Sequence, residues 1–284
     1  MHDPLWQSMR DDGGIAGHPV RFLAATDSTN TVAMALAREG APPGTLVVAE
    51  GQSAGRGRLA RQWLSPPGRG LYVSFILRPT LELADLPKIT LAAGVALCRA
   101  VVRATNVGVR LKWPNDLLLH GKKCGGILAE TSGLVGDGPM AVILGIGINV
   151  NTPQAFFPAE LNDKATSLAA TAGREFMRGP LLLALVEEVD DVVRLLEKGG
   201  FAEILAAWRQ HDGLTDQRLT WITPQGAVVT GISLGPDEDG RLHIRDDAGT
   251  VHEVLSGDLT LAAGCSPFWP AVSPTTITRP GRRN

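Results

Sequence analysis

The sequence contains little cysteine. Cys98, Cys124 and Cys265 are the only three cysteines in 284 residues. They are widely spaced and form no C-x-x-C pair, which argues against structural zinc and predicts reduced thiols in a cytoplasmic protein. The six histidines show no H-E-x-x-H or comparable metal-binding spacing. We therefore do not expect a transition metal held by the protein alone.

Long apolar runs and a strong net charge are also missing. No apolar run approaches the roughly 18 to 20 residues that span a bilayer, and residues 1–17 lack the apolar centre of a signal peptide. The formal net charge is only −2, so no global field would draw the protein to nucleic acid or to an anionic membrane. We expect neither a membrane nor a nucleic acid as partner. With 44% hydrophobic and 20% charged residues the composition is ordinary for a soluble globular protein.

Two common nucleotide-binding motifs do not occur. The sequence has no G-x-x-x-x-G-K-[ST], and Gly145-Ile146-Gly147 lacks the third glycine and the following helix of a dinucleotide fingerprint. If the protein binds ATP, it does so without a P-loop.

The sequence does contain a basic stretch interrupted by glycine, from Glu50 to Trp63 (E-G-Q-S-A-G-R-G-R-L-A-R-Q-W). Guanidinium groups stay charged and suit bidentate contact with phosphate or carboxylate oxygens, so Arg56, Arg58 and Arg61 indicate an anion site. Glycines can reach φ > 0 and allow the backbone to approach a ligand closely. We interpret the stretch as a clamp for an anion.

The residues Gly51-Gln52-Ser53-Ala54-Gly55 also fit G-x-S-x-G, the nucleophile elbow of serine hydrolases. An elbow needs a helix to begin directly after the serine, and the glycines that follow Ser53 would each cost a helix about 1 kcal/mol. The one close acid–base pair, His211-Asp212, is adjacent and in the wrong chain order. A hydrolase is therefore disfavoured, and reaction of Ser53 with a fluorophosphonate probe would revive it.

A second stretch, Lys112-Trp113-Pro114-Asn115-Asp116, is followed by K-K-C-G-G-I-L at residues 122–128. Together with G-R-G-R-x-x-R-x-W at residues 55–63, it resembles the paired signatures of biotin protein ligases, the enzymes that attach biotin to carboxylases. The resemblance covers roughly residues 19–262.

The resemblance implies an α+β fold. Its core is a mixed β-sheet with helices, like that of class II aminoacyl-tRNA synthetases, and a small SH3-like β-barrel follows at the C-terminus. We expect a flexible N-terminus at 1–16, a catalytic domain at 17–212, the barrel at 213–263 and a disordered tail at 264–284. We find no pattern of an N-terminal DNA-binding domain and expect no repressor function.

Hydrophobic periodicity predicts the elements independently of the resemblance. We expect a helix at residues 31–38, capped by Asp27 or Ser28, and further helices at 86–105, 179–198 and 201–210. Strands are expected at 19–24, 46–50, 70–78, 109–113, 125–130 and 140–150. Five short strands separated by turns should follow between residues 218 and 261.

The resemblance implies a reaction in two steps. The biotin carboxylate first attacks the α-phosphate of ATP, which gives biotinyl-5′-AMP and pyrophosphate. A lysine amine of a biotin carboxyl carrier domain, from an acyl-CoA or pyruvate carboxylase, then attacks the mixed anhydride and releases AMP. Bringing two anions together requires positive charge where they meet.

The resemblance also implies the site residues. Lys123, Arg56 and Arg58 are expected to be catalytic. Asn115 and Asp116 are expected to hold Mg²⁺, directly or through water. The expected substrate-binding residues are Ser28, Thr29, Asn30, Gln52, Gly55, Gly57, Arg61, Trp63, Lys112, Trp113, Gly125, Gly126, Ile127 and Asn149. A structural role remains open for Lys112, as does a strand-end cap for Asn149.

Two further alternatives stay open at this point. A lipoate or octanoate ligase would share the catalytic fold, and a binding module would hold biotin or a nucleotide without turnover. The expected ligands are biotin, ATP and Mg²⁺, and the expected assembly is a monomer or a weak homodimer.

Overall fold

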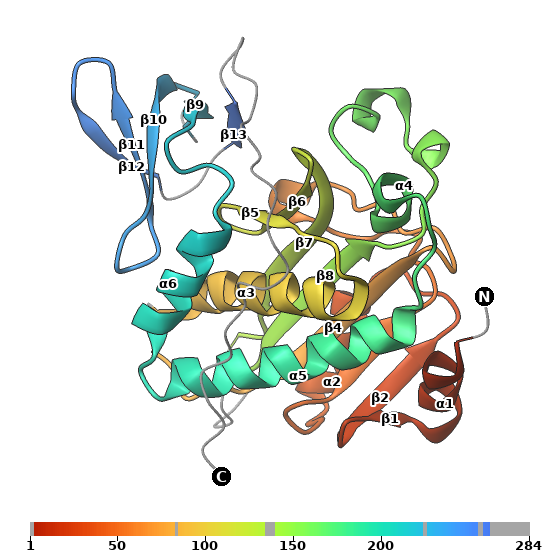
Figure 1. Ribbon diagram of the computed structural model, residues 1–284. Coiled ribbons are helices and arrows are strands. Elements are labelled where there is room, and N and C mark those ends of the chain that lie inside the picture. The colour runs from red at the N-terminus through yellow and green to blue at the C-terminus, as the bar shows by residue number, and fades with distance from the viewer. Residues whose placement is uncertain (1–2, 83–84, 134–139, 224–225, 255–257, 262–284) are drawn as a thin grey trace.

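Two β-sheets, one large and one small, organise the chain in the computed structural model (Figure 1). The structure describes residues 3–82, 85–133, 140–223, 226–254 and 258–261. The expected disordered tail at 264–284 lies outside these residues. No helix of the described part is long and apolar enough to cross a membrane.

The large sheet has the strand order β1-β2-β3-β4-β8-β7-β6-β5. Strands β2 and β3 pair in parallel and the other neighbours pair antiparallel, so the prediction of a mixed sheet is confirmed. Its strands are β1 (Gly14–Ile15), β2 (His18–Leu23), β3 (Leu46–Ala49), β4 (Gly70–Leu77), β5 (Arg110–Lys112), β6 (Asp116–Leu119), β7 (Lys122–Thr131) and β8 (Val142–Asn149).

Helices cover both faces of this sheet, and α3, α5 and α6 lie together on one face (Figure 1). The helices are α1 (Pro4–Asp12), α2 (Thr29–Arg38), α3 (Leu86–Thr105), α4 (Leu168–Ala172), α5 (Arg178–Glu197) and α6 (Phe201–His211). Short 3-10 helices are η1 (Arg58–Ala60), η3 (Gln154–Phe156) and η4 (Ala159–Leu161).

Strand β4 shows how the two faces differ. Successive side chains of a strand point to opposite faces. Val73 and Phe75 belong to the core that contains α3, α5 and α6, whereas Ile76 packs with α2 on the other side. Ser74 therefore faces α2. The same alternation places Gly145 and Gly147 of β8 on the α2 face, because Leu144 and Ile146 belong to the larger core.

The small sheet is antiparallel, with the strand order β12-β11-β10-β9-β13. The five predicted C-terminal strands are therefore confirmed, but a closed barrel is not: in the described residues β12 and β13 are the two edges of the sheet. The strands are β9 (Arg218–Ile222), β10 (Val228–Pro236), β11 (Leu242–Asp246), β12 (Val251–Val254) and β13 (Asp258–Leu261).

Helix α1 and strand β1 lie within residues 3–16, the segment for which we expected a flexible N-terminus. Asp3 caps α1 by accepting a hydrogen bond from the backbone N–H of Trp6, and Gly13 ends the helix in the left-handed conformation at φ 65°. Trp6 and Met9, three positions apart on one face of the helix, are buried. Their burial ties the helix to the sheet and to α5.

Helix α1 also reaches the base of the arginine loop. The indole Nε1 of Trp6 donates to Glu50 Oε1 at 2.8 Å, and Arg178 Nη1 donates to Glu50 Oε2 at 2.7 Å. Burial raises the pKa of the Glu50 carboxyl, but the hydrogen bonds from Arg178 and Trp6 together with the charge of Arg178 lower it more. The pKa therefore lies below its ordinary value.

The Glu50 contacts predict a pH-dependent stability. Glu50→Gln should lower the free energy of unfolding at pH 7 by about 1.5–3 kcal/mol, the range for hydrogen bonds to a charged group. The depressed pKa means that this contribution is present above the ordinary carboxyl pKa and is lost as the pH falls through the folded-state value. Urea denaturation of both proteins from pH 7 to pH 3 should therefore show a shrinking difference.

Glu175→Gln is the matched control for that experiment, because Glu175 is 51% exposed and pairs with Arg69 at 3.4 Å. An exposed pair of this kind contributes about 0–1 kcal/mol. A Glu50→Gln difference that stays constant with pH would contradict the prediction.

Candidate active site

The arginine loop connects β3 to β4 and folds back on itself as a short hairpin. The backbone N–H of Gly57 donates to Arg61 O at 2.7 Å, and that of Trp63 donates to Gly55 O at 2.8 Å. Arg56 and Gln62 form an antiparallel bridge between these two hydrogen bonds. The arginines therefore lie on a paired backbone, in fixed register with Trp63.

Gly55 of the loop makes room for a close backbone contact, and neither Gly55 nor Gly57 adopts positive φ. A Cβ at Gly55 would lie 2.5 Å from Trp63 O, so only glycine fits in the hairpin. Gly57 is extended, with φ −123° and ψ 179°. The left-handed conformations are found at Leu59 (φ 55°) and Ala60 (φ 58°), at the tip of the loop. Each non-glycine residue in this region costs about 1–2 kcal/mol, and such strain often accompanies function.

Three cationic side chains of the expected site are each held by an oxygen of the chain itself. Arg56 Nη2 lies 2.7 Å from Glu130 Oε2, and Lys123 Nζ lies 2.6 Å from Asp116 Oδ1. Arg58 Nη1 donates to Asn115 Oδ1 at 3.2 Å. The acceptors come from β6, β7 and the turn before β6. The structure thus brings together both sequence motifs, as the expected site requires.

A change of register between β6 and β7 directs Lys123 to this group. Leu117 pairs with Gly125 and Leu118 pairs with Lys123, so one residue of β7 is passed over. A bulge of this kind turns a side chain out of the regular alternation. The Lys123 ammonium lies beside Gly126, 3.5 Å from the position of a Cβ there. The backbone of Lys123 is fixed as well, because its N–H donates to Lys164 O at 2.8 Å.

The Trp63 indole packs against the backbone of Gly126 and Gly147. A Cβ at Gly147 would come within 2.6 Å of Trp63 Nε1, and a Cβ at Gly126 within 3.4 Å of Trp63 Cζ3. The Lys123 ammonium lies 5.4 Å from the centre of the indole ring, within the range of a cation–π contact. Larger side chains at the two glycines would displace Trp63 and with it the end of the arginine loop.

The Ser28-Thr29-Asn30 triplet forms the start of α2, but neither Asp27 nor Ser28 caps this helix as expected. Ser28 occupies the N-cap position without a capping hydrogen bond from its side chain. Gln52 of the arginine loop takes that role, since its Oε1 accepts from the backbone N–H of Thr29 at 2.8 Å. The first turn needs an acceptor, and a residue distant in sequence supplies it.

Gln52 and Asn30 are held by side chains of the protein. Gln52 Nε2 donates to Ser65 Oγ at 2.8 Å. Asn30 Nδ2 donates to Glu130 Oε2 at 2.7 Å, and Asn30 Oδ1 lies 2.6 Å from the Ser74 hydroxyl. The buried triplet therefore forms a polar network behind the loop.

Lys112 and Trp113 make contacts that we did not expect for substrate-binding residues. Lys112 Nζ donates to Leu259 O at 2.8 Å, and Trp113 Nε1 donates to Gly240 O at 2.9 Å. Leu259 belongs to β13 of the small sheet, and Gly240 lies in the turn between β10 and β11. The Lys112 contact fits the structural role that the sequence left open for this residue, and Trp113 contacts the same C-terminal part of the chain.

The other residues that we expected to bind substrate make contacts within the protein through their backbone or their side chains. The Ile127 side chain points into the large core, while its carbonyl accepts from Asn115 Nδ2 at 2.8 Å. A Cβ at Gly125 would lie 3.1 Å from Leu117 Cβ, so this glycine serves packing. Asn149 is buried and donates to Thr166 O at 3.0 Å, which fits the strand-end cap. The Arg61 backbone closes the loop hairpin.

Sequence reasoning missed Glu130, Ser74 and Ser65. Each lies in or beside a segment that we predicted as a strand or a loop exit, where a polar residue among apolar ones was the available signal. Alternation along β7 and β4 would have placed Glu130 and Ser74 on one face. Nothing in the sequence shows that this face meets the triplet of α2.

The serine hydrolase alternative has no support in the local geometry. No helix begins after Ser53, which is exposed, and the Ser53 hydroxyl lies 3.4 Å from Thr26 O. A nucleophile elbow requires the strand–serine–helix turn that is absent at this position.

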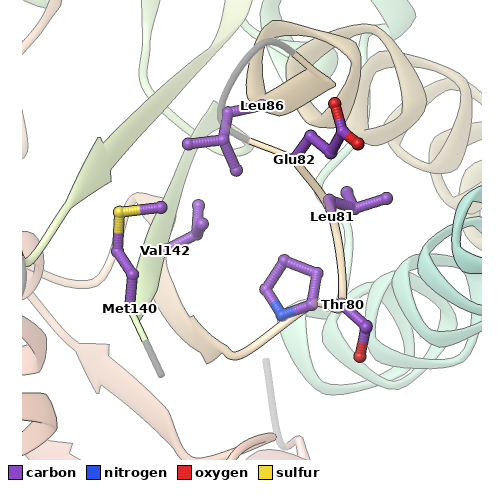
Figure 2. A pocket seen from close by; sticks show the side chains of 7 residues that line it. Thr80, Leu81, Glu82, Leu86, Met140 and Val142 are labelled. Atoms are coloured by element: carbon purple, nitrogen blue, oxygen red, sulfur yellow. The ribbon is translucent and has the colours of Figure 1, made fainter. Parts of the chain in front are cut away.

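A hollow lies away from this site, at the ends of β4 and β8 where Leu77 pairs with Val142 (Figure 2). Its lining is mostly apolar and carries one carboxylate, that of Glu82. None of the residues of the two motifs lines it. We therefore do not associate it with the proposed chemistry. Its lining residues are Pro79, Thr80, Leu81, Glu82, Leu86, Met140 and Val142.

Comparison with known proteins shows which family the chain resembles. Residues 22–149 match the family described as the Biotin/lipoate A/B protein ligase family. The chain is 36% identical over 247 residues to the bifunctional ligase/repressor BirA of Bacillus subtilis, covering 87% of this chain and 75% of that protein. It is 35% identical over 232 residues to the biotin–[acetyl-CoA-carboxylase] ligase of Paracoccus denitrificans, covering 80% of this chain and 95% of that protein.

Among solved structures, the fold is similar to that of the biotin protein ligase from Aquifex aeolicus in complex with biotin and ATP. The TM-score is 0.72 at 32% sequence identity, and the match covers 85% of this chain and 97% of the other.

The contacts of Lys112 predict a loss of stability on substitution. Lys112→Met keeps much of the apolar stem but removes the donor to Leu259 O, and should lower the free energy of unfolding by about 1.5–3 kcal/mol. Urea denaturation followed by circular dichroism measures this change.

Lys122→Met is the matched control, because Lys122 donates to Asn162 O at 3.0 Å from an exposed position. Exposed substitutions of this kind usually change stability by less than about 0.5 kcal/mol. Equal effects of the two substitutions would show that Lys112 does not hold the small sheet.

Proposed function

The chain belongs to the biotin/lipoate A/B protein ligase family, and on that premise we propose that it is an ATP-dependent biotin protein ligase. The single observation that carries the proposal is that the two sequence motifs contact each other: Arg58 of the arginine loop donates to Asn115, and Trp63 of the same loop lies beside Lys123 and Gly126. Arg56 and Lys123 each contact one carboxylate, and a guanidinium or ammonium group has more donors than one such contact uses. Such a group can receive two anions at once.

In the first step, a carboxylate oxygen of biotin forms a bond to the α-phosphorus of ATP. The bond from that phosphorus to the oxygen bridging to the β-phosphate breaks, and pyrophosphate leaves. Both reactants are anionic, so Arg56 and Arg58 lower their repulsion, while Lys123 lies where the carboxylate and the phosphate meet. The protein contributes position and charge, which account for most of the catalysis in phosphoryl transfer.

In the second step, the neutral amine of an acceptor lysine attacks the acyl carbon of biotinyl-5′-AMP. The carbon–nitrogen bond forms, the bond to the AMP oxygen breaks, and the amine loses a proton. The name of the Paracoccus relative indicates an acetyl-CoA carboxylase as acceptor for that protein. We propose a biotin carboxyl carrier domain as the partner of this chain.

For Mg²⁺ we propose a site built mainly from the phosphates of ATP. Asp116 supplies one carboxylate, whose Oδ1 already contacts Lys123, and Asn115 supplies an amide oxygen that contacts Arg58. Mg²⁺ commonly binds through one or two carboxylates, several waters and substrate phosphates, so this sparse donor set fits. When bound, the ion would supply further neutralisation of phosphate charge.

For the domain organisation we propose that the catalytic unit runs to about residue 212. It includes helix α1, which contacts the base of the arginine loop through Trp6 and Glu50. We propose that the small sheet takes the place of the family's C-terminal barrel. Our proposal concerns ligase activity, and a repressor activity is named for the Bacillus relative.

The function is tested by pyrophosphate–ATP exchange. Purified protein with Mg²⁺ should incorporate labelled pyrophosphate into ATP when biotin is present, because the first step is reversible. Lipoate and octanoate are the comparison acids. Exchange with lipoate or octanoate alone would reassign the acid pocket within the family, and no exchange with any acid would favour a binding module.

The role of Lys123 is tested by Lys123→Ala in the same assay. By analogy with the removal of one oxyanion donor, the exchange rate should fall about a hundredfold or more. Lys122→Ala, one residue earlier and pointing to Asn162 instead, is the control and should exchange at the wild-type rate. A normal rate in a folded Lys123→Ala protein would remove Lys123 from the mechanism.

A further inference from the structure

One oxygen atom of Glu130 joins three separate segments of the chain. Glu130 Oε2 lies 2.7 Å from Arg56 Nη2 of the arginine loop and 2.7 Å from Asn30 Nδ2 of helix α2. Glu130 itself belongs to β7. The two motifs that led to the proposed function do not include this residue.

The geometry leaves Arg56 available for a ligand. A guanidinium group has five N–H donors, and the contact with Glu130 uses its Nη2. The Arg56 side chain is 43% exposed and that of Glu130 is 28% exposed, so the pair lies at the surface of the site. Glu130 can fix the direction of Arg56 while other donors remain free to turn to an anion.

Asn30 extends the contact of Glu130 back to the arginine loop. The Ser74 hydroxyl lies 2.6 Å from Asn30 Oδ1 and 2.8 Å from Thr29 Oγ1. Thr29 Oγ1 in turn donates to Gln52 Oε1 at 3.1 Å. Gln52 is the third residue of the Glu50–Trp63 stretch, so the network that leaves the loop at Arg56 re-enters it there.

The far end of the loop is connected in the same way. Gln52 Nε2 donates to Ser65 Oγ at 2.8 Å, and the Ser65 hydroxyl donates to Trp63 O at 3.1 Å. The beginning, the middle and the end of the loop are thus tied to one polar network. Among the residues of the network named here, Glu130 supplies the one carboxylate. Its contact with Arg56 joins the network to the middle of the loop.

We propose that Glu130 is a positioning residue for the adenylation step: it holds Arg56 and Asn30 in the orientation in which the loop receives the two anionic substrates. This inference rests on the proposed function. Glu130 acts through Arg56 and Asn30 and does not touch the reacting atoms. The opposite role, in which Glu130 competes with the substrates for Arg56, predicts tighter substrate binding when the carboxylate is removed.

The first test compares Glu130→Ala and Glu130→Gln in pyrophosphate–ATP exchange with biotin. Glu130→Ala should lower kcat/KM for biotin about ten- to a hundredfold, the effect of losing a hydrogen bond to a charged group. Glu130→Gln keeps one acceptor oxygen and should fall between the alanine variant and the wild type. A lower KM for biotin in Glu130→Ala would support competition and overturn the proposal.

Glu187→Gln is the matched control, because Glu187 pairs with Arg103 at 2.8 Å on helix α5, outside the network. Its kcat/KM should stay within about twofold of the wild type, as for a surface pair. An equal loss in this variant would show that the effect of Glu130 is not specific to the site.

A double-mutant cycle separates positioning from a general structural role. If Glu130 acts largely through Arg56, then Glu130→Ala should cost much less in an Arg56→Ala background than in the wild type. Fully additive losses would overturn the proposal. Cooperative thermal unfolding of each variant establishes that it is folded, and Glu130→Gln replaces the alanine variant in the cycle if the latter does not fold.

A final measurement does not depend on catalysis. Trypsin cleaves after arginine, and without substrates the loop of Glu130→Ala should be cut after Arg56, Arg58 or Arg61 several-fold faster than in the wild type, because local opening becomes easier. An unchanged cleavage rate would overturn the positioning role. If the wild type shows no exchange while Glu130→Ala still accelerates cleavage, the proposed function fails and the contact of Glu130 with the loop stands.

Discussion

The site depends on one kind of interaction, the contact of each positively charged side chain with an acceptor of the chain itself. Arg56 and Arg58 come from the arginine loop and Lys123 from β7, and an acceptor beside each cation offsets the repulsion between like charges. Glu130, Asn115 and Asp116 supply those acceptors from neighbouring strands and a turn. Each of the three cations thereby has a fixed partner before any substrate arrives. Charged groups that are fixed in advance can stabilise the charge that develops during a reaction without rearranging.

The acceptors of Arg58 and Lys123 lie in a short segment, residues 112–116, that also contacts the C-terminal part of the chain. Lys112 donates to a carbonyl of β13 and Trp113 to a carbonyl in the turn between β10 and β11, whereas Asn115 and Asp116 hold cations of the site. Residues 112–116, which include the end of β5, the turn and the start of β6, therefore contact both the C-terminal part of the chain and the cations Arg58 and Lys123. A sheet that supplies none of the three cations still helps to fix where two of them lie.

Much of the fold was predictable because the hydrophobic periodicity of its longer elements is strong. Helices α3, α5 and α6 and strands β4 and β8 were predicted to within about three residues at each end. Helix α1 was missed although Asp3, Pro4 and Gly13 are ordinary start and stop signals, since its polar faces obscured the two buried residues. Strand β6 was missed because it begins only two residues after Pro114 and is four residues long. The SH3-like barrel is not confirmed in the described residues, since local alternation does not determine how the edges of a sheet meet.

The sequence by itself determined the residue types of the site. Arginines among glycines, a second motif with carboxylate and amide, and a lysine before two glycines specify anion chemistry wherever the chain places them. Only the tertiary structure decided which of these residues meet and which serve packing, and it added Glu130, Ser74 and Ser65. The physical reason is that hydrogen bonds across strands depend on register and on the face of the sheet. A shift of one residue, as between β6 and β7, turns Lys123 from one face to the other.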